Sequence, residues 1–235
     1  AEEGCRQIHG QADEVEMMVG GLPDYSQSTH NPLRYAVTWS VDGLINEYRD
    51  DCLILEDGEI KTVKGMDGLI KVEGENFGQM EAFYTSGGAS HSIHSMRSRG
   101  VKNCSYRTLR YRGHRDIVKF LIKDCGLDDF SLEQIFVTGC GHANKDEVFI
   151  VAEVKGGDKT WRRERVIKAD ENFSAMQKAT AFPIASVAAL MAEGVFDGPK
   201  EQHRDYYTQY SRSLAYNDIP FDLFKEKLNI LGIKT

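Results

Sequence analysis

The feature that most constrains this fold is a long hairpin sequence over residues 146–169, DEVFIVAEVKGGDKTWRRERVIKA. A run with Val, Ile and Phe precedes the turn residues Gly156, Gly157 and Asp158, and a run with Thr, Trp, Val and Ile follows them. Such runs, separated by a glycine-containing turn, are typical of two antiparallel strands. We therefore expect two adjacent strands here and a fold organised around a sheet.

Further strand patterns occur along the chain. They cover residues 13–23 (DEVEMMVGGLP), 35–40 (YAVTWS), 52–65 (CLILEDGEIKTVKG, two short strands around Asp57-Gly58), 79–86 (QMEAFYTS) and 104–112 (CSYRTLRYR). Several of these runs are joined by short turns, which favours antiparallel pairing. The doubly wound alternative would need strands that alternate regularly with helices.

Helical patterns lie between and after these strands. They cover residues 1–10, 41–51 with Ser40 as the N-cap, 114–125 closed by Gly126, 173–196 interrupted by Pro183, and 221–233, and residues 87–100 indicate a glycine-led loop followed by a short helix that ends at Gly100. Apolar residues at helical spacing and the capping residues carry these predictions. Together, strands and helices predict an α+β fold with a mixed, largely antiparallel sheet.

Composition limits the classes of function. Acidic residues outnumber basic ones by 36 to 29, giving a net charge of −7, which argues against nucleic-acid binding. The chain shows no apolar run of membrane-spanning length and its first residues lack the order of a signal peptide, so we expect a cytoplasmic protein without a membrane partner. The five cysteines are scattered without C-x-x-C spacing, which favours reduced thiols over disulfides or zinc.

The segment 103–120, NCSYRTLRYRGHRDIVKF, concentrates basic and hydrogen-bonding residues where a predicted strand meets a helix. Alternation places Arg110 on one strand face with Thr108, and Arg107 on the opposite face. Gly113 permits a turn, and the free amides of a helix that starts near His114 favour carboxylates. The segment predicts a carboxylate pocket around Arg110; a solvated edge strand paired with surface acids is the alternative.

Two other groups of residues raise chemical hypotheses. His91 and His94 are three residues apart, so they share one helix face and could hold a metal, or could equally be capping or solvent-facing residues. No third ligand accompanies them, so we expect no metal site. No G-x-G-x-x-G fingerprint stands between a strand and a helix, which indicates that this chain has no dinucleotide cradle.

Four blocks of the chain, taken in order, resemble the saccharopine dehydrogenase family. The segment TLRYRGHRDIVKFL resembles that family's T-L-R-Y-x-G segment, and TWSVDGLINEY resembles its W-S-x-x-G helix start. EAFYTSGGASHSIHSM resembles the lysine 6-dehydrogenase-like branch, and TAFPIASVAALMAEGVF with FDLFKEKLNILGI resembles the closing helices. Residues 197–217 depart from the family because they are longer, more polar and more aromatic than its usual link.

The resemblance implies an oxidoreductase that uses NAD or NADP on a Rossmann domain and acts on the C–N bond of lysine or a lysine-derived amino acid. It implies that the present chain corresponds to the second part of such a protein, with helices on one face of a sheet similar to that of the C-terminal domain of glyceraldehyde-3-phosphate dehydrogenase. Residues 1–12 would be the remnant of an interdomain helix, 13–172 the substrate-binding and dimerisation domain, and 173–235 helices that return to the Rossmann domain. A homodimer is therefore expected.

The resemblance also assigns site residues. Arg110 would clamp a substrate carboxylate, with Tyr111 and His114 beside it. Thr85, Ser86 and Gly87 would line the same cleft through backbone amides, and His91 would act as a proton shuttle or, alternatively, as a capping residue. The rival hypotheses are a binding or dimerisation module that shares the fold without catalysis, and a zinc amidohydrolase that uses the two histidines.

The missing fingerprint generates a direct prediction. Because the pyrophosphate of a dinucleotide binds at a glycine-rich helix start that this chain lacks, the chain should bind NADH and NADPH only weakly. Calorimetry should give dissociation constants above about 100 μM, equivalent to roughly 5.5 kcal/mol. A tighter constant for either nucleotide would show that the chain carries its own cofactor site.

Overall fold

The computed structural model describes residues 1–8, 10–25, 31–88, 90–143, 145–196 and 218–234. The chain divides into two compact units at the beginning of one long helix, with the boundary between Met176 and Gln177. The first unit contains the sheet, and the second contains most of that helix together with the last helix. Within the described ranges, no helix combines the length and the apolar character needed to cross a membrane.

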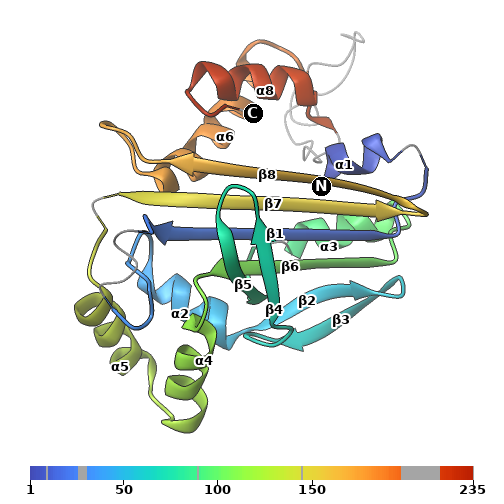
Figure 1. Ribbon diagram of the computed structural model, residues 1–235. Helices are drawn as coiled ribbons and strands as arrows, with labels where there is room; N and C mark the ends of the chain where they lie inside the picture. Colours follow the sequence, from blue (N-terminus) through green and yellow to red (C-terminus); the bar gives the residue numbers. More distant parts are fainter. Residues whose placement is uncertain (9, 26–30, 89, 144, 197–217, 235) are drawn as a thin grey trace, which may run out of the picture. The chain divides into compact units, whose positions relative to one another are not determined.

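One eight-stranded sheet forms the first unit (Figure 1). Its strands are β1 (Glu14–Pro23), β2 (Asp51–Glu56), β3 (Glu59–Lys64), β4 (Ile70–Gly74), β5 (Gly78–Tyr84), β6 (Asn103–Arg110), β7 (Asp146–Gly156) and β8 (Lys159–Lys168). The order is β3-β2-β6-β1-β7-β8, and the hairpin β4–β5 joins β6 through β5. Only β1 and β6 pair in parallel, so the predicted mixed, largely antiparallel sheet is confirmed.

The helices differ in length and type. They are α1 (Glu2–Gln7), α2 (Val41–Arg49), α3 (Ser90–Ser98), α4 (His114–Lys119), the π-helix η1 (Phe120–Asp124), α5 (Asp129–Gln134), the π-helix η2 (Ile135–Cys140), α6 (Ala175–Ala192) and α8 (Phe221–Ile230). Figure 1 shows α2, α4 and α5 gathered at the end of the sheet where β1 ends. The predicted cap of α2 is confirmed, because the Ser40 side chain accepts a hydrogen bond from Gly43 N at 3.2 Å.

Two hydrophobic cores stabilise the sheet. One lies against α1 and α3 and contains Val15, Leu55, Cys104 and Val154, which come from four different strands. The larger core joins α2, α4 and the two π-helices to the hairpin β4–β5 and includes Phe83 and Leu109. Burial of apolar surface at roughly 25 cal/mol per Å² makes these cores the main source of stability.

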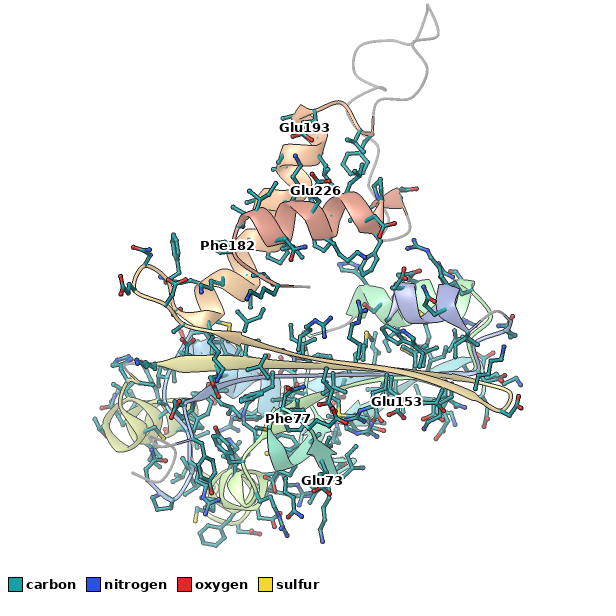
Figure 2. All side chains as sticks on the ribbon, turned by 45° about the horizontal axis from the view of Figure 1, so that its top comes forward. Glu73, Phe77, Glu153, Phe182, Glu193 and Glu226 are labelled. Carbon is teal, nitrogen blue, oxygen red and sulfur yellow. The ribbon has the colours of Figure 1, made fainter. Side chains whose placement is uncertain are left out.

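The hairpin β4–β5 crosses in front of the sheet in Figure 1. Near its tip, Phe77 packs edge to face on Phe149 of β7, with ring centroids 5.7 Å apart. The contact anchors the hairpin over β7, although among the described strands the hairpin is joined to the rest of the sheet through the pairing of β5 with β6. Figure 2 shows Glu73 and Phe77 of the hairpin on the side of the sheet away from α1 and α3.

In the second unit, α6 and α8 are linked near the end of α6. Lys227 of α8 donates a hydrogen bond to the carboxylate of Glu193 at 2.5 Å, and Figure 2 labels Glu193 at this end. The predicted terminal helix is confirmed as α8. The predicted interruption at Pro183 is wrong, because α6 runs through it. Proline removes one intrahelical hydrogen bond, but the alanine-rich sequence on both sides strongly favours a helix.

The strand predicted at residues 35–40 is also wrong. This segment forms only an isolated bridge between Val37 and His142. The Asn31 side chain donates to Tyr35 O at 2.7 Å and accepts from Tyr35 N at 3.3 Å, which satisfies the backbone of Tyr35 without a neighbouring strand. Conversely, neither β4 nor the π-helix η2 was predicted from the sequence. The segment 197–217 lies outside the described residues.

A buried carboxylate fixes the start of α4. Glu81 of β5 lies opposite Arg110 in the sheet and accepts hydrogen bonds from Gly113 N at 2.9 Å and Arg115 N at 2.7 Å. These amides have no intrahelical acceptor at a helix start, so a carboxylate there satisfies them and complements the helix dipole. Gly113 itself has a φ of +94°, which favours glycine.

Replacing Glu81 should therefore destabilise the domain. Glu81→Gln keeps the shape but offers only one acceptor oxygen to two amides, so we expect a loss of about 1–3 kcal/mol in the free energy of unfolding. Urea unfolding measures this loss. Glu73→Gln on β4, which is exposed, is the matched control. Equal stabilities of the two variants would contradict the capping role.

Candidate functional site

The candidate site lies where β6 ends, beneath α2. Arg110 is the last residue of β6, and its side chain is only 2% exposed. The rings of Tyr35 and Tyr48 lie 5.2 and 5.7 Å from its guanidinium carbon, within the range of cation–π attraction. A buried cation is stable only where partners compensate for its lost hydration, so its contacts define the site.

Two of the three nitrogens of the Arg110 guanidinium, Nε and Nη1, donate hydrogen bonds, and within the described residues the third, Nη2, does not. Nε donates to the Tyr48 hydroxyl at 2.9 Å, and Nη1 donates to Leu109 O at 2.9 Å. Nη2 lies 4.0 Å from Oε2 of Glu47, which is beyond hydrogen-bond distance. The guanidinium therefore has a fixed orientation and presents one edge towards Glu47.

The hydrogen bonds continue from Tyr48 into the interior. The Tyr48 hydroxyl lies 2.9 Å from Nε2 of His114, and Nδ1 of His114 lies 2.8 Å from Leu33 O. A carbonyl oxygen can only accept, so Nδ1 carries the proton and the neutral ring accepts from Tyr48 through Nε2. Every donor in this row therefore points away from Arg110 and towards Leu33.

Burial keeps His114 neutral. The residue is only 1% exposed. Burial, assisted by the nearby charge of Arg110, lowers the pKa of His114 to about 3, while its hydrogen bond to Leu33 opposes this shift. The ring is therefore an uncharged acceptor for Tyr48 throughout the neutral pH range.

Glu47 borders the site on its more exposed side. Its side chain is 20% exposed, ten times the fraction of Arg110. Burial raises the pKa of Glu47 to about 7, although the attraction of Arg110 acts in the opposite direction. The Glu47 carboxyl therefore changes charge near neutral pH, unlike the neighbouring tyrosines, whose pKa values burial raises.

The loop after β5 joins the same cluster. The hydroxyl of Thr85 is buried and lies 2.7 Å from that of Thr108, the residue that shares its face of β6 with Arg110. Ser86 donates its backbone N–H to Glu47 O at 3.1 Å and its hydroxyl to Asn46 O at 3.3 Å. Gly87 follows with a φ of +83°. The structure thus brings Thr85 and Ser86 together with Arg110 through α2 and β6.

Tyr111 and the histidines of α3 lie elsewhere. Tyr111 is buried on the other face of β6, where its hydroxyl donates to Pro23 O at 3.0 Å. His91 and His94 are exposed on α3, whereas Ile93 and Met96 of that helix face the core. Within the described part of the chain, no group of three or more His, Cys, Asp or Glu side chains could hold a metal ion.

Arg107, expected to be a simple contrast to Arg110, is itself enclosed. It pairs with Glu16 of β1, donates through Nη2 to the Tyr84 hydroxyl at 2.8 Å, and lies 4.4 Å from the centroid of that ring. A substitution of Arg107 would therefore break a second network. Arg112 is the better comparison, because it is exposed and, in the described part of the chain, its side chain donates only to Gln79 Oε1, at 3.0 Å.

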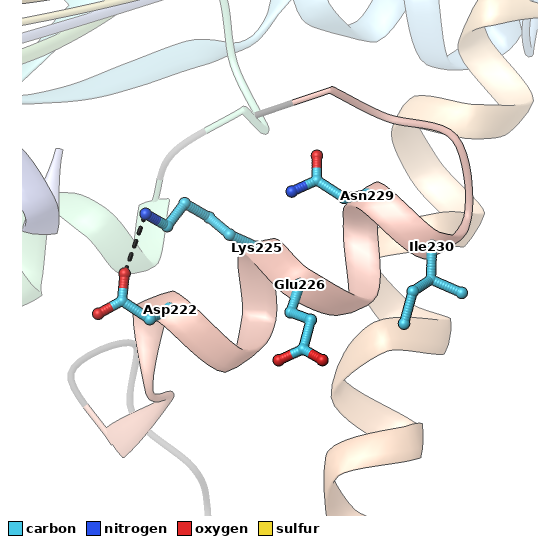
Figure 3. Close-up of a pocket in the computed structure, with 5 residues that line it drawn as sticks. All are labelled: Asp222, Lys225, Glu226, Asn229 and Ile230. Atoms are coloured by element: carbon cyan, nitrogen blue, oxygen red, sulfur yellow. Dashed lines mark ion pairs between the residues drawn. The ribbon is translucent and has the colours of Figure 1, made fainter.

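Two surface depressions offer less chemistry. One lies along α8 and is lined by Asp222, Lys225, Glu226, Asn229 and Ile230 (Figure 3). Its lysine already pairs with Asp222 at 2.9 Å. The other lies between the tip of hairpin β4–β5 and β8, where Arg162 pairs with Glu153 and Glu164 at 3.0 and 2.7 Å. Both depressions are open to solvent, and ion pairs of this kind contribute little energy.

A mixed, largely antiparallel sheet with helices makes this chain an α+β domain, and its buried polar cluster is centred on Arg110 at the end of β6. Over residues 1–214 the chain matches the family model of the saccharopine dehydrogenase C-terminal domain, and it belongs to that family. The family predicted from the four sequence blocks is thereby confirmed.

A solved structure shows the same fold. The chain is similar to apo histidine-tagged saccharopine dehydrogenase (L-Glu forming) from Saccharomyces cerevisiae, with a TM-score of 0.61 and 16% sequence identity. The similarity covers 84% of this chain and 62% of the yeast chain. The present chain thus matches less than two thirds of the length of that protein.

Sequence reasoning missed three residues of this cluster. The sequence pattern predicts a strand at Tyr35, and it indicates Glu47 and Tyr48 only as part of the helix that begins in TWSVDGLINEY. Tyr48 repeats at helical spacing with Leu44 and Ile45, which indicates burial but no partner. The one sequence feature that could have indicated a buried position for Glu47 is that it directly precedes Tyr48.

The neutral state of His114 gives a prediction for stability. Its pKa is lower in the folded state, about 3, than its ordinary value of 6.5, so the folded protein binds fewer protons between these values. The stability it contributes above pH 6.5 should be lost as the pH falls towards 3, on the order of a few kcal/mol. His114→Gln should flatten this loss in urea unfolding between pH 7 and 4.

His94→Gln is the control for this experiment, because His94 is exposed. It should keep the wild-type pH profile. Identical profiles for wild type and His114→Gln would mean that His114 is not a buried neutral group.

Proposed function

We propose that this chain is the substrate-binding domain of an NAD(P)-dependent saccharopine dehydrogenase-like oxidoreductase. The substrate would be lysine or a lysine-derived amino acid, and the reaction would be hydride transfer at its C–N bond. Family membership supports the class of enzyme. The particular substrate and the choice between NAD and NADP belong to the proposal.

The observation that carries the proposal is the free edge of Arg110. Two sides of its guanidinium are fixed by Tyr48 and Leu109, while Nη2 has no acceptor within hydrogen-bond distance among the residues that the structure describes. A guanidinium held in one orientation binds a carboxylate with little further loss of entropy. Such a contact would orient an amino-acid substrate and bring its reacting carbon to a defined place.

The other predicted residues take supporting roles in this proposal. Thr85, Ser86 and Gly87 would form the wall of the cleft opposite Arg110. His114 would act as a positioning residue, because both of its nitrogens are engaged and it orients Tyr48. Tyr111 would stabilise the end of β6 from the opposite face. His91 would shuttle a proton only if a substrate reached the exposed side of α3.

The proposal extends to the protein that contains this domain. A bound nicotinamide cofactor, NAD or NADP, would supply or accept the hydride, and we propose that it binds a Rossmann domain outside the present sequence. The chain alone would then be inactive. The boundaries at residues 12 and 172, a homodimer formed through this domain, and a likeness to the C-terminal domain of glyceraldehyde-3-phosphate dehydrogenase are parts of the same proposal.

One observation favours a second candidate, a non-catalytic binding or dimerisation module. Arg110 is almost completely buried, and most of its interactions are internal. An arginine in this position could serve only to organise the interior. The two candidates predict different effects of Arg110→Lys. The substitution lowers catalytic activity without loss of stability if Arg110 binds substrate, and it leaves no specific catalytic effect if Arg110 only organises the interior.

In the protein that carries a nicotinamide-binding domain, Arg110→Lys should lower kcat/KM by roughly ten- to a hundredfold. The lysine keeps the charge but loses the fork, which contributes on the order of 1.5 to 3 kcal/mol to carboxylate binding. Arg112→Lys should have little effect. Thermal unfolding of both variants separates a loss of fold from a loss of binding. Equal, small effects of the two substitutions would favour the non-catalytic module.

A further inference from the structure

Glu47 is a mostly buried carboxylate with no hydrogen-bond donor. In the described part of the chain, its one ionic neighbour is Nη2 of Arg110 at 4.0 Å, and no donor reaches its oxygens. Buried carboxylates normally accept several hydrogen bonds, because they are costly to remove from water. The carboxylate of Glu47 thus lies beside Nη2 of Arg110, and in the described part of the chain neither group has a hydrogen-bonding partner from the protein.

The two residues differ in their access to solvent. Arg110 is 2% exposed and Glu47 is 20% exposed. Solvent therefore reaches the Glu47 side chain more readily than the Arg110 side chain, and Glu47 lies beside the Nη2 edge. The Ser86 N–H donates to Glu47 O and the Ser86 hydroxyl donates to Asn46 O, so the loop after β5 is held against the end of α2 that carries Glu47.

The charges around Glu47 are few. The ionisable groups that interact with it are Arg110 and Tyr106 from β6, Tyr35 from the segment before α2, Tyr48 from its own helix and Cys52 from β2. Burial raises the pKa of Tyr106 to about 12 and that of Cys52 to about 12, so these two groups are neutral below pH 9. Among these groups, Arg110 and Glu47 therefore determine the net charge around the pair.

A carboxylate ligand would disturb this balance. With Glu47 ionised, Arg110 and Glu47 sum to zero, and a bound carboxylate would leave one uncompensated negative charge in a buried place. If Glu47 takes up a proton, the sum returns to zero. The resulting carboxyl group also gains an O–H donor that the bound carboxylate can accept.

We propose that Glu47 is a specificity-determining residue that takes up a proton from solvent when a substrate carboxylate binds Arg110, and that it then donates a hydrogen bond to that carboxylate. This proposal rests on the proposed function of Arg110. Glu47 excludes carboxylates while it is ionised and admits them in its protonated form. No bond other than that to the proton is made or broken.

The test uses glutarate as a probe, because its carboxylates stay ionised from pH 6.5 to 9. Calorimetric titration of the 235-residue chain is carried out across this range in two buffers with different heats of ionisation. Because the carboxyl of free Glu47 has a pKa of about 7, the affinity of the wild type should fall by about tenfold per pH unit above 7. Proton uptake should approach one per glutarate at pH 9.

Three variants complete the experiment. Glu47→Gln imitates the protonated state, so it should bind with equal affinity at every pH and without proton uptake. Glu47→Asp keeps an ionisable group and should keep the uptake, which guards against a variant that fails to fold. Asp42→Asn, at an exposed position in the first turn of the same helix, should behave as the wild type.

The outcomes separate this proposal from the one on which it rests. Glutarate binding that depends on Arg110 but is independent of pH, without proton uptake, overturns the role of Glu47 and leaves the Arg110 site intact. A Glu47→Gln variant with the wild-type pH dependence does the same. No binding of glutarate, or undiminished binding by Arg110→Lys, overturns the carboxylate site itself and the role of Glu47 with it.

Discussion

The buried charge of Arg110 is the interaction on which the polar interior of this domain depends. From its Nε a row of hydrogen bonds runs through Tyr48 and His114 to Leu33, with every donor pointing the same way. The direction is set by the last carbonyl, which can only accept. Removal of any member would leave a buried polar group without a partner, so α2, β6 and α4 are held together as one unit.

Two buried carboxylates cap the starts of helices. Glu81 binds the first amides of α4, and Asp146 of β7 accepts from Ala175 N at 2.7 Å and Met176 N at 2.9 Å at the start of α6. Each helix therefore begins at a point set by a strand. Because Glu81 lies beside Arg110 in the sheet, the position of His114 follows directly from strand pairing.

Local sequence patterns predicted most of this sheet, since alternation and turns such as Asp57-Gly58 are local properties. The strand β4 was not predicted, because its five residues are too few to show a clear alternation. The candidate site was only partly predictable. The importance of Arg110 could be inferred from its neighbours along β6, but Glu47 reaches the site through the packing of α2, which no spacing along the chain specifies. The burial of His114 likewise depends on Tyr48 and Leu33, which are distant in sequence.

The hairpin β4–β5 spans more of the domain than its pairing suggests. Through Glu81 it sets the start of α4, through the loop after Tyr84 it holds the end of α2, and through Phe77 it rests on β7. The hairpin therefore contacts three different elements of the domain. Because the same hairpin fixes both the start of α4 and the end of α2, a change in its length or twist would move both helices at once, while the residues of the Arg110 cluster stayed the same.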